Sequence, residues 1–403
     1  MKSMSAASCV LAYSGGLDTS ALIPYLKENY GYEIIAALVD VGRMKDLEAL
    51  RQRALTAGAA EAVIVDAKEE FLRDFAFRAL RANALYEGRY PLHSALSRPL
   101  IAQKMVEMAR ARGAKVVAHG CTAKGNDQVR IDVSVRCLDP SVEVIGPARE
   151  WNMTRPQLLD YLEERGISLP LTKKNPYSID ENLWGRAIEC GELEDPWAAA
   201  PEGAWLSTVD PEKAPDKPEE IVVGFEAGVP VSVNGTRKNA VGLVEEVDAI
   251  AGAHGFGRVD MVENRLVGIK SREVYEVPGS LSLIMAHREL EDLTLTRELQ
   301  HFKTGIDQRM TELIYDGMWF SPLAECLRAF IDESQEQVSG EVRLRYFKGS
   351  CQPVGRRSAN SLYVSDLATY GAGDAFKHET AVGFIHLWGL PLEVWARKRE
   401  GKL

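Results

Sequence analysis

Short apolar runs alternate with segments of helical spacing through the first 150 residues of the chain. The apolar runs at residues 9–13, 33–41, 62–66, 116–119 and 142–145 are long enough for buried strands. Between them, apolar side chains that recur every three or four residues predict helices over 19–28, 45–57 and 97–112. This alternation indicates an α/β fold with a doubly wound parallel sheet, in which ligands bind beyond the carboxyl ends of the strands.

The pattern changes after residue 150. A helix over 154–164, with a capping box of Thr154 and Gln157, precedes a turn-rich stretch at 170–182 that we interpret as the crossing out of the first domain. An irregular stretch over 195–218 follows, which we expect to wrap a surface. The later part predicts strands at 221–225, 229–233, 259–269 and 272–277, helices over 241–253 and between 281 and 338, and a hairpin of 341–347 with 352–357.

Two short motifs, together with the end of the regular alternation of strands and helices after residue 150, support the predicted division into domains. Asn234-Gly235 is a hairpin turn signal, and Ser321-Pro322 is a helix start. We predict a first domain over 1–170, a second, α+β domain over 171–363 and a helical C-terminal tail over 364–403.

The tail carries an apolar segment that includes Phe384, Trp388 and Trp395. Such a segment needs a surface to cover it. We expect a neighbouring subunit of a homo-oligomer to supply this surface, with packing on the tail's own chain as the alternative.

Composition narrows the function classes. The 403 residues are 46% hydrophobic and 26% charged, with a formal net charge of −10, which argues against a protein whose main partner is nucleic acid. The six cysteines are scattered without Cys-x-x-Cys pairs, so we expect reduced thiols in a cytoplasmic protein. The sequence shows no signal peptide and no apolar run of membrane-spanning length, so we expect no membrane partner.

The first strand leads into a glycine pair followed by hydroxyl residues. Gly15 and Gly16 allow a sharp turn and a close approach to a ligand, and Ser14, Thr19 and Ser20 add hydroxyl donors. The helix that follows points unpaired N–H groups at the turn. We expect an anionic phosphate there, with an ordinary strand-to-helix turn as the alternative reading.

A polar loop follows the fourth predicted strand. Residues 119–130 combine Thr122, Asn126, Asp127 and Arg130 with two glycines, which is more functional chemistry than a connector needs. A solvated surface loop is the alternative. Because ligands of such sheets bind beyond the carboxyl ends of the strands, we expect functional residues in the segments after the first, second and fourth strands.

Longer strings resemble known families. Residues 14–20, Ser-Gly-Gly-Leu-Asp-Thr-Ser, resemble the pyrophosphate-binding loop of the N-type ATP pyrophosphatases, and the sequence has no Walker A motif. The chain as a whole resembles the argininosuccinate synthase family. Seven strings in the family's order carry this resemblance: residues 12–20, 84–87, 97–99, 124–130, 175–178, 262–265, and 270–272 with Tyr275-Glu276.

The resemblance implies a cytoplasmic ligase of arginine biosynthesis with ATP as cosubstrate and Mg²⁺ as cofactor. It would join citrulline to aspartate through a citrullyl-AMP intermediate and release AMP and pyrophosphate. The implied assembly is a homotetramer. The first domain would be the ATP-pyrophosphatase domain, and the second would bind the amino acids.

The resemblance also assigns site residues. The implied ATP-binding residues are Ala12, Tyr13, Ser14, Gly15, Gly16, Leu17, Asp18, Thr19, Ser20, Val39 and Gly120. Citrulline would contact Tyr90, Asn126, Arg130, Ser178, Glu263 and Tyr275, and aspartate would contact Thr122, Asn126 and Asp127. The expected catalytic residues are Asp18, Asp127 and Arg130. Asp18 and Asp127 could assist magnesium, although the sequence fixes no metal ligand.

Several positions near the expected site depart from the family's usual residues: Arg43, the run His93-Ser94-Ala95, Ala123, Asp132 and Ala187. Alanine at position 123 would be strained if its φ were positive. Two alternatives therefore stay open. One is another ATP pyrophosphatase, such as a tRNA-modifying or amide-forming enzyme, and the other is a binding protein that has lost turnover.

Overall fold

The computed structural model describes residues 7–151, 153–167 and 177–402. The chain forms two compact units, one that ends at Asn360 and one that begins at Ser361. The predicted division at residue 170 falls outside the described residues, as do Asn175 and Pro176, and the three-domain division stays a prediction. None of the described helices is long and apolar enough to cross a membrane.

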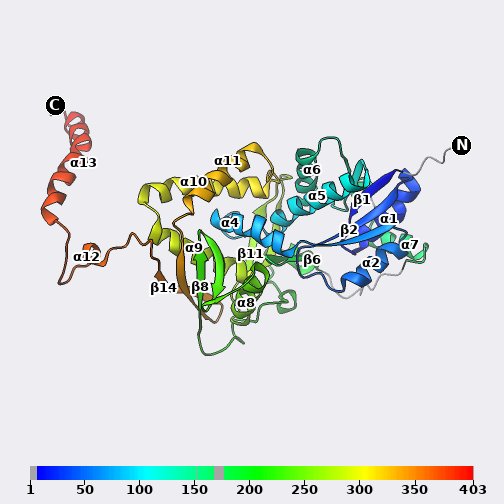
Figure 1. The fold of residues 1–403 in the computed structure, drawn as a ribbon, viewed down its shortest axis with the longest axis horizontal. Helices are drawn as coiled ribbons and strands as arrows, with labels where there is room; N and C mark the ends of the chain where they lie inside the picture. Colours follow the sequence, from blue (N-terminus) through cyan, green and yellow to red (C-terminus); the bar gives the residue numbers. More distant parts are fainter. Residues whose placement is uncertain (1–6, 152, 168–176, 403) are drawn as a thin grey trace. The chain divides into compact units, whose positions relative to one another are not determined.

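A parallel sheet of five strands organises the first part of the chain (Figure 1). Its strands are β1 (Ser8–Ala12), β2 (Glu33–Asp40), β3 (Glu61–Asp66), β4 (Val116–Ala118) and β5 (Glu143–Ile145), in the spatial order β3-β2-β1-β4-β5. All five predicted strands are confirmed within a residue or two. The order reverses between β1 and β4, so the turns that follow these two strands diverge and leave a crevice.

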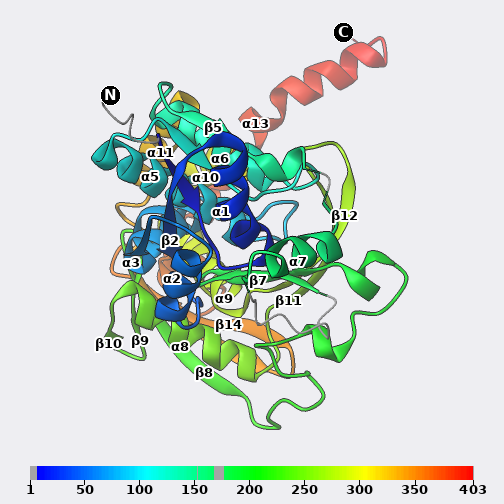
Figure 2. The same cartoon turned by 90° about the vertical axis from the view of Figure 1, so that its right-hand side faces the viewer.

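Helices cover both faces of this sheet, as the doubly wound fold requires (Figure 2). Cys9 and Leu11 of β1 pack in one buried cluster with α1 (Leu17–Tyr30), α2 (Leu47–Thr56) and α7 (Arg155–Glu163). Val10, which points to the opposite face, packs in the other cluster with α5 (His93–Arg112) and α6 (Asp127–Leu138). The predicted helices and the Thr154/Gln157 capping box are confirmed.

Two helical segments of this part were not predicted. Residues 119–130 were read as a loop, but α6 begins at Asp127 and places the Arg130 side chain on a buried helix face. Residues 68–81 form α3 (Lys68–Glu70), a π-helical turn (Phe71–Ala76) and α4 (Phe77–Arg81). The wider π-helical turn departs from the 3.6-residue repeat that sequence patterns detect.

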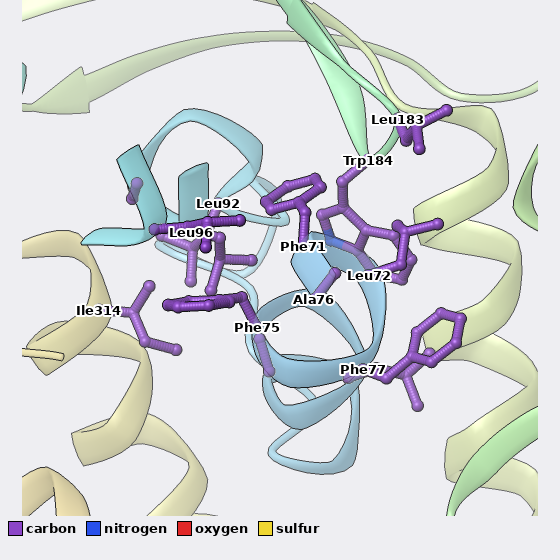
Figure 3. Packing of buried hydrophobic residues seen from close by; sticks show 14 of the residues in the cluster. Phe71, Leu72, Phe75, Ala76, Phe77, Leu92, Leu96, Leu183, Trp184 and Ile314 are labelled. Atoms are coloured by element: carbon purple, nitrogen blue, oxygen red, sulfur yellow. The ribbon is translucent and has the colours of Figure 1, made fainter. Parts of the chain in front are cut away.

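This π-helical segment joins the α/β part to the rest of the unit (Figure 3). Phe71, Leu72 and Phe75 are almost fully buried, and they lie in one cluster with Trp184 and Ile314 from distant parts of the chain. Phe75 also stacks on Trp319 with ring centroids 4.9 Å apart. The five-stranded parallel sheet and the later elements of the chain therefore share one continuous hydrophobic core.

Two antiparallel sheets follow. The five-stranded sheet has the order β10-β9-β8-β13-β14, formed by β8 (Glu219–Glu226), β9 (Val229–Val233), β10 (Thr236–Arg237), β13 (Gly340–Phe347) and β14 (Ser350–Arg357). Val233 pairs with Thr236, so Asn234 and Gly235 form the two-residue hairpin turn predicted from sequence, both with positive φ. The late hairpin is likewise confirmed.

The four-stranded sheet has the order β11-β12-β7-β6, formed by β6 (Ser178–Asn182), β7 (Gly185–Glu189), β11 (Arg258–Asn264) and β12 (Lys270–Glu276). The reading of residues 178–182 as turn-rich is wrong, because they form β6. The strand predicted over 259–269 ends at Asn264, where a turn leads back into β12.

Helices α8 (Ala240–Ala253), α9 (Pro278–Thr294), α10 (Arg297–Tyr315) and α11 (Pro322–Ser334) complete the first unit, and Ser321 caps α11 as predicted. In the described part of this unit, short 3₁₀ turns lie at Pro147–Arg149, Gly191–Glu194 and Glu202–Ala204. The second unit contains α12 (Ser365–Ala368) and α13 (His378–Arg399), so the predicted helical tail is confirmed as a helix.

Candidate active site

A cavity of about 590 Å³ lies at the crevice beyond β1 and β4. The turn after β1, the segment after β2 and the segment after β4 form much of its wall, and residues of β2, α2, α5, α6 and β6 also line it. This is the place where doubly wound sheets bind ligands. We call it the nucleotide cavity.

The glycine turn borders this cavity with a fixed geometry. Gly15 has φ of +77°, and a Cβ at this position would lie 2.4 Å from Leu50 Cδ2, so both the backbone and the packing require glycine. The Ser14 hydroxyl accepts a hydrogen bond from Gly16 N at 3.3 Å and lies 3.2 Å from Thr19 Oγ1. The N-cap of α1 is Gly16, which has no side chain to cap the helix, and the start of a helix with such a cap is suited to an anion.

Most residues expected to bind ATP line this cavity: Ala12, Tyr13, Ser14, Gly16, Asp18, Thr19, Val39 and Gly120. Three others do not line it. Gly15 forms the turn behind the wall, Leu17 is buried in the core, and the buried Ser20 hydroxyl lies 3.2 Å from the Tyr13 hydroxyl. These three residues therefore contribute to the shape of the turn and do not line the cavity.

The wall after β4 is held by a buried histidine. His119 Nδ1 accepts a hydrogen bond from Cys121 N, so its Nε2 carries the proton and donates to Asp132 at 2.8 Å. Asp132 also accepts from Arg149. Burial alone would raise the pKa of the Asp132 carboxyl, but these hydrogen bonds outweigh burial and lower it. A Cβ on Gly120 would lie 3.2 Å from Thr19 Cγ2, so glycine keeps this wall close to α1.

A second, smaller cavity of about 100 Å³ adjoins the first, and Asp180 lines both. One face of the four-stranded sheet forms its floor. Asp180 pairs with Ala187, which pairs with Tyr275, so these three residues lie in one row across β6, β7 and β12. All six residues expected to contact citrulline line this cavity: Tyr90, Asn126, Arg130, Ser178, Glu263 and Tyr275. We call it the amino-acid cavity.

A buried carboxylate lies in the wall of the amino-acid cavity. Glu263 is 4% exposed and accepts hydrogen bonds from the Tyr275 hydroxyl at 2.6 Å and the Tyr315 hydroxyl at 2.8 Å. Asn126 donates to the same Tyr315 hydroxyl at 2.9 Å. Burial raises the pKa of Glu263, although the two phenol hydroxyls oppose this rise. The site thus holds a fixed carboxylate suited to an ammonium group.

Asp127 and Arg130 form the other side of this cavity. Arg130 donates from Nη1 to Asp127 Oδ1 at 2.9 Å and from Nε to the Tyr315 carbonyl at 2.9 Å. Its Nη2 atom is buried and has no hydrogen-bond partner among the described residues. Such an orphaned guanidinium nitrogen is suited to a carboxylate ligand.

Asp127 is a poor proton acceptor in this arrangement. Burial alone would raise the pKa of its carboxyl, but the guanidinium groups of Arg98 and Arg130 outweigh burial and hold the pKa well below the usual range. Asp127 therefore stays ionised, and its charge orients cations. Of the residues expected to contact aspartate, Asn126 and Asp127 line the amino-acid cavity, whereas Thr122 is exposed and lines neither cavity.

A group of charged residues that sequence reasoning missed borders the amino-acid cavity. Arg265 donates from Nη2 to both Glu189 and Glu273. Burial raises the pKa of Glu273 to about 7, and the neighbouring Glu189 carboxylate adds to this rise. Arg98, Asp180 and Tyr315 were missed as well. The string Ser97-Arg98-Pro99 was a usable signal for Arg98, but nothing local marks the other two.

Of the departures from the family's usual residues, Arg43 lies in the left-handed region with φ of +68°. Ala123 is not among the residues with positive φ, and its carbonyl accepts a hydrogen bond from Gln128. Arg43 lines the nucleotide cavity and bonds Asp248 of α8 and the Asn182 carbonyl, so it ties the segment after β2 to the later elements. Ala187 lies in the floor of the amino-acid cavity, where a larger side chain would take up room.

Comparisons with known proteins indicate one family along nearly the whole chain. The family model described as "Arginosuccinate synthase N-terminal HUP domain" matches residues 8–168, and the one described as "Arginosuccinate synthase C-terminal domain" matches residues 177–395. The chain is 56% identical over 400 residues to the argininosuccinate synthase of Symbiobacterium thermophilum, covering 99% of this chain and all of that protein. It is 57% identical over 385 residues to that of Bacillus subtilis, with 96% and 95% covered. The chain belongs to the argininosuccinate synthase family.

Proposed function

We propose that this enzyme joins citrulline to aspartate with ATP, and that the nucleotide cavity holds ATP while the amino-acid cavity holds citrulline. The observation that carries this assignment is the shared wall at Asp180, because the reaction needs both substrates to meet at one point. The turn after β1 and the start of α1 would bind the phosphates, and Val39 would face the base.

The first step is attack by the ureido oxygen of citrulline on the α-phosphorus of ATP. A bond forms between that oxygen and the phosphorus, the bond to the bridging oxygen breaks, and pyrophosphate leaves with its charge. The nucleophile is a neutral ureido oxygen, so alignment and charge stabilisation carry this step. The N–H groups of the glycine turn would receive the leaving pyrophosphate.

Citrulline would be held at its amino-acid end. The buried Nη2 of Arg130 would pair with its carboxylate, and Glu263 would pair with its ammonium group. Tyr90 and Tyr275 stack with ring centroids 4.3 Å apart and would line the aliphatic chain. The ureido group would then point toward Asp180 and the nucleotide cavity.

In the second step, the amine of aspartate attacks the activated carbon and AMP leaves. Asn126 and Asp127 would contact aspartate, as the family resemblance implies. Because Asp127 stays ionised between two arginines, we assign it an orienting role rather than that of the base.

ATP would enter as its magnesium complex. Among the described residues, no three His, Cys, Asp or Glu side chains are grouped to hold a metal ion by themselves. Asp18 lines the nucleotide cavity in the first turn of α1, where its carboxylate oxygen fits a phosphate-bound magnesium ion. Magnesium would neutralise phosphate charge there. Asp127 is not suited to magnesium, since both of its oxygens already accept hydrogen bonds from arginines.

We also propose that the enzyme is a cytoplasmic homo-oligomer, a tetramer by family resemblance, in which α13 packs on another copy. Apolar side chains along this helix are exposed: Val382, Phe384, Ile385, Leu387, Trp388, Leu392 and Trp395. Another copy of the chain would cover them.

Pyrophosphate release from Mg-ATP tests the function, with citrulline and aspartate supplied together and each omitted in turn. We expect release to need citrulline and argininosuccinate to appear only with aspartate present. Citrulline or ATP binding without any release would instead support a binding protein. Release that is independent of citrulline would point to a different ATP pyrophosphatase.

A further inference from the structure

Arg98 lies between the two cavities. It belongs to α5, lines the nucleotide cavity, and its side chain is 15% exposed. Its Nη2 donates to Asp127 Oδ2 at 2.7 Å and to Asp180 Oδ2 at 2.6 Å, and both carboxylates line the amino-acid cavity. The guanidinium group therefore marks the boundary where ATP and citrulline would meet.

The guanidinium group is fixed in place and charged. Its Nη1 donates to the buried Ser97 hydroxyl at 3.1 Å, and Ser97 in turn donates to the Ser94 carbonyl. Among the described residues, these bonds occupy three of the five guanidinium N–H groups, which leaves the Nε–H and one Nη1 hydrogen for a ligand. Although burial alone would lower its pKa, Asp127 and Asp180 raise the pKa of Arg98 above its ordinary value, so it stays protonated.

The other cations that line the nucleotide cavity are placed differently. Arg43 and Lys45 follow β2, which lies on the far side of β1 from β4, and Arg43 is engaged by Asp248. In the amino-acid cavity, Arg265 is held between two glutamates. Among the described residues, Arg98 is the cation that lines the nucleotide cavity and is also held by carboxylates that line the amino-acid cavity.

We propose that Arg98 is a catalytic residue of the first step, in which it contacts the α-phosphate and stabilises the negative charge that builds up on its oxygens as citrulline attacks. This proposal rests on the proposed function of the two cavities. A preorganised cation at the reacting phosphorus stabilises the developing charge and costs no reorganisation during the step. Asp127 and Asp180 keep the cation in place before ATP arrives.

The test measures the first step alone. Pyrophosphate release is followed in a single turnover with saturating Mg-ATP and citrulline and without aspartate, for the wild type, Arg98→Gln and Arg98→Lys. We expect release to slow about 100-fold or more in Arg98→Gln and about tenfold in Arg98→Lys, which keeps the charge but loses the planar fork. Arg110→Gln, an exposed arginine on the same helix, should match the wild type.

A positioning role through Asp127 and Asp180 would give a different result. It would raise the KM for citrulline or aspartate and leave the saturated rate of the first step within threefold of wild type, and that outcome overturns the proposal. If Arg98→Gln does not fold by circular dichroism, Arg98→Lys decides, and a wild-type rate in this variant overturns it. A wild-type enzyme that releases no pyrophosphate would instead refute the proposed function and the role of Arg98 with it.

Discussion

The hydroxyl of Tyr315, at the last position of α10, donates a hydrogen bond to Glu263 in β11 at 2.8 Å. The same hydroxyl accepts from Asn126, and the Tyr315 carbonyl accepts from Arg130. One residue thus sets the positions of three side chains that would hold citrulline. Its ring stacks on Tyr86 with centroids 3.5 Å apart, which fixes the hydroxyl.

We predict that Tyr315→Phe raises the KM for citrulline about tenfold or more. The substitution removes a hydrogen bond to a buried carboxylate, worth about 1.5–3 kcal/mol, and leaves Asn126 without its acceptor. Steady-state kinetics with citrulline varied would show this, with the KM for ATP within twofold of wild type. Tyr161→Phe, which removes a surface hydroxyl bonded to Glu28, is the matched control. An unchanged KM for citrulline would contradict the role of Tyr315.

We predict that the affinity for citrulline falls as the pH falls through 7. Burial raises the pKa of Glu273 to about 7, so between pH 8 and pH 6 this carboxylate gains a proton and the amino-acid cavity loses one negative charge. Glu263, whose pKa burial also raises, acts in the same direction. The KM for citrulline should therefore rise about threefold to tenfold toward pH 6, because the ammonium group meets less negative charge.

Glu273→Gln isolates this titration. The variant should show at pH 8 a KM for citrulline close to that of the wild type at pH 6, with a flatter pH profile. The KM for ATP measured over the same range serves as the control, since Glu273 does not line the nucleotide cavity. A wild-type KM for citrulline that stays constant from pH 8 to pH 6 would refute the prediction.

The glycine turn offers a matched pair of substitutions. Gly15 and Gly31 both have positive φ, but a Cβ on Gly15 would collide with Leu50, whereas a Cβ on Gly31 meets nothing within 4 Å. Gly31→Ala should cost about 1–2 kcal/mol from backbone strain and leave the KM for ATP unchanged. Gly15→Ala should lower the thermal midpoint further and raise the KM for ATP. Equal effects of the two variants would show that the turn tolerates the collision.

The parts of the site that the sequence predicted depend on local signals. The first strand, Gly15, and the hydroxyls of Ser14 and Thr19 lie within a dozen residues, where apolar spacing and glycine chemistry directly determine the turn. The hairpin at Asn234-Gly235 was predicted for the same reason, since both residues accept positive φ.

The parts that were missed depend on tertiary contacts. β6 reads Ser-Ile-Asp-Glu-Asn, and its polar side chains at Ser178 and Asp180 face the amino-acid cavity, so apolar alternation does not mark it as a strand. Tyr315 reaches Glu263 across 52 positions of the chain. The sequence near either residue carries no sign of the other. Arg98 lies within an otherwise ordinary helix, and its contact with Asp180 depends on the packing of β6 against α5.

Truncation of α13 tests whether this helix contacts another copy of the chain. The second compact unit begins at Ser361, so removal of residues 380–403 leaves the first unit, with both cavities, complete. If α13 binds another copy of the chain, the truncated protein should have a lower mass by light scattering than the full chain.

The double substitution Phe384→Asp with Trp388→Asp keeps the length of the chain but places two charges on a stacked aromatic pair, and it should lower the mass as well. Lys398→Gln on the same helix should leave the mass unchanged. An unchanged mass in both the truncated and the doubly substituted protein would mean that subunits associate through another surface, because a desolvated helix interface cannot accommodate two unpaired aspartates.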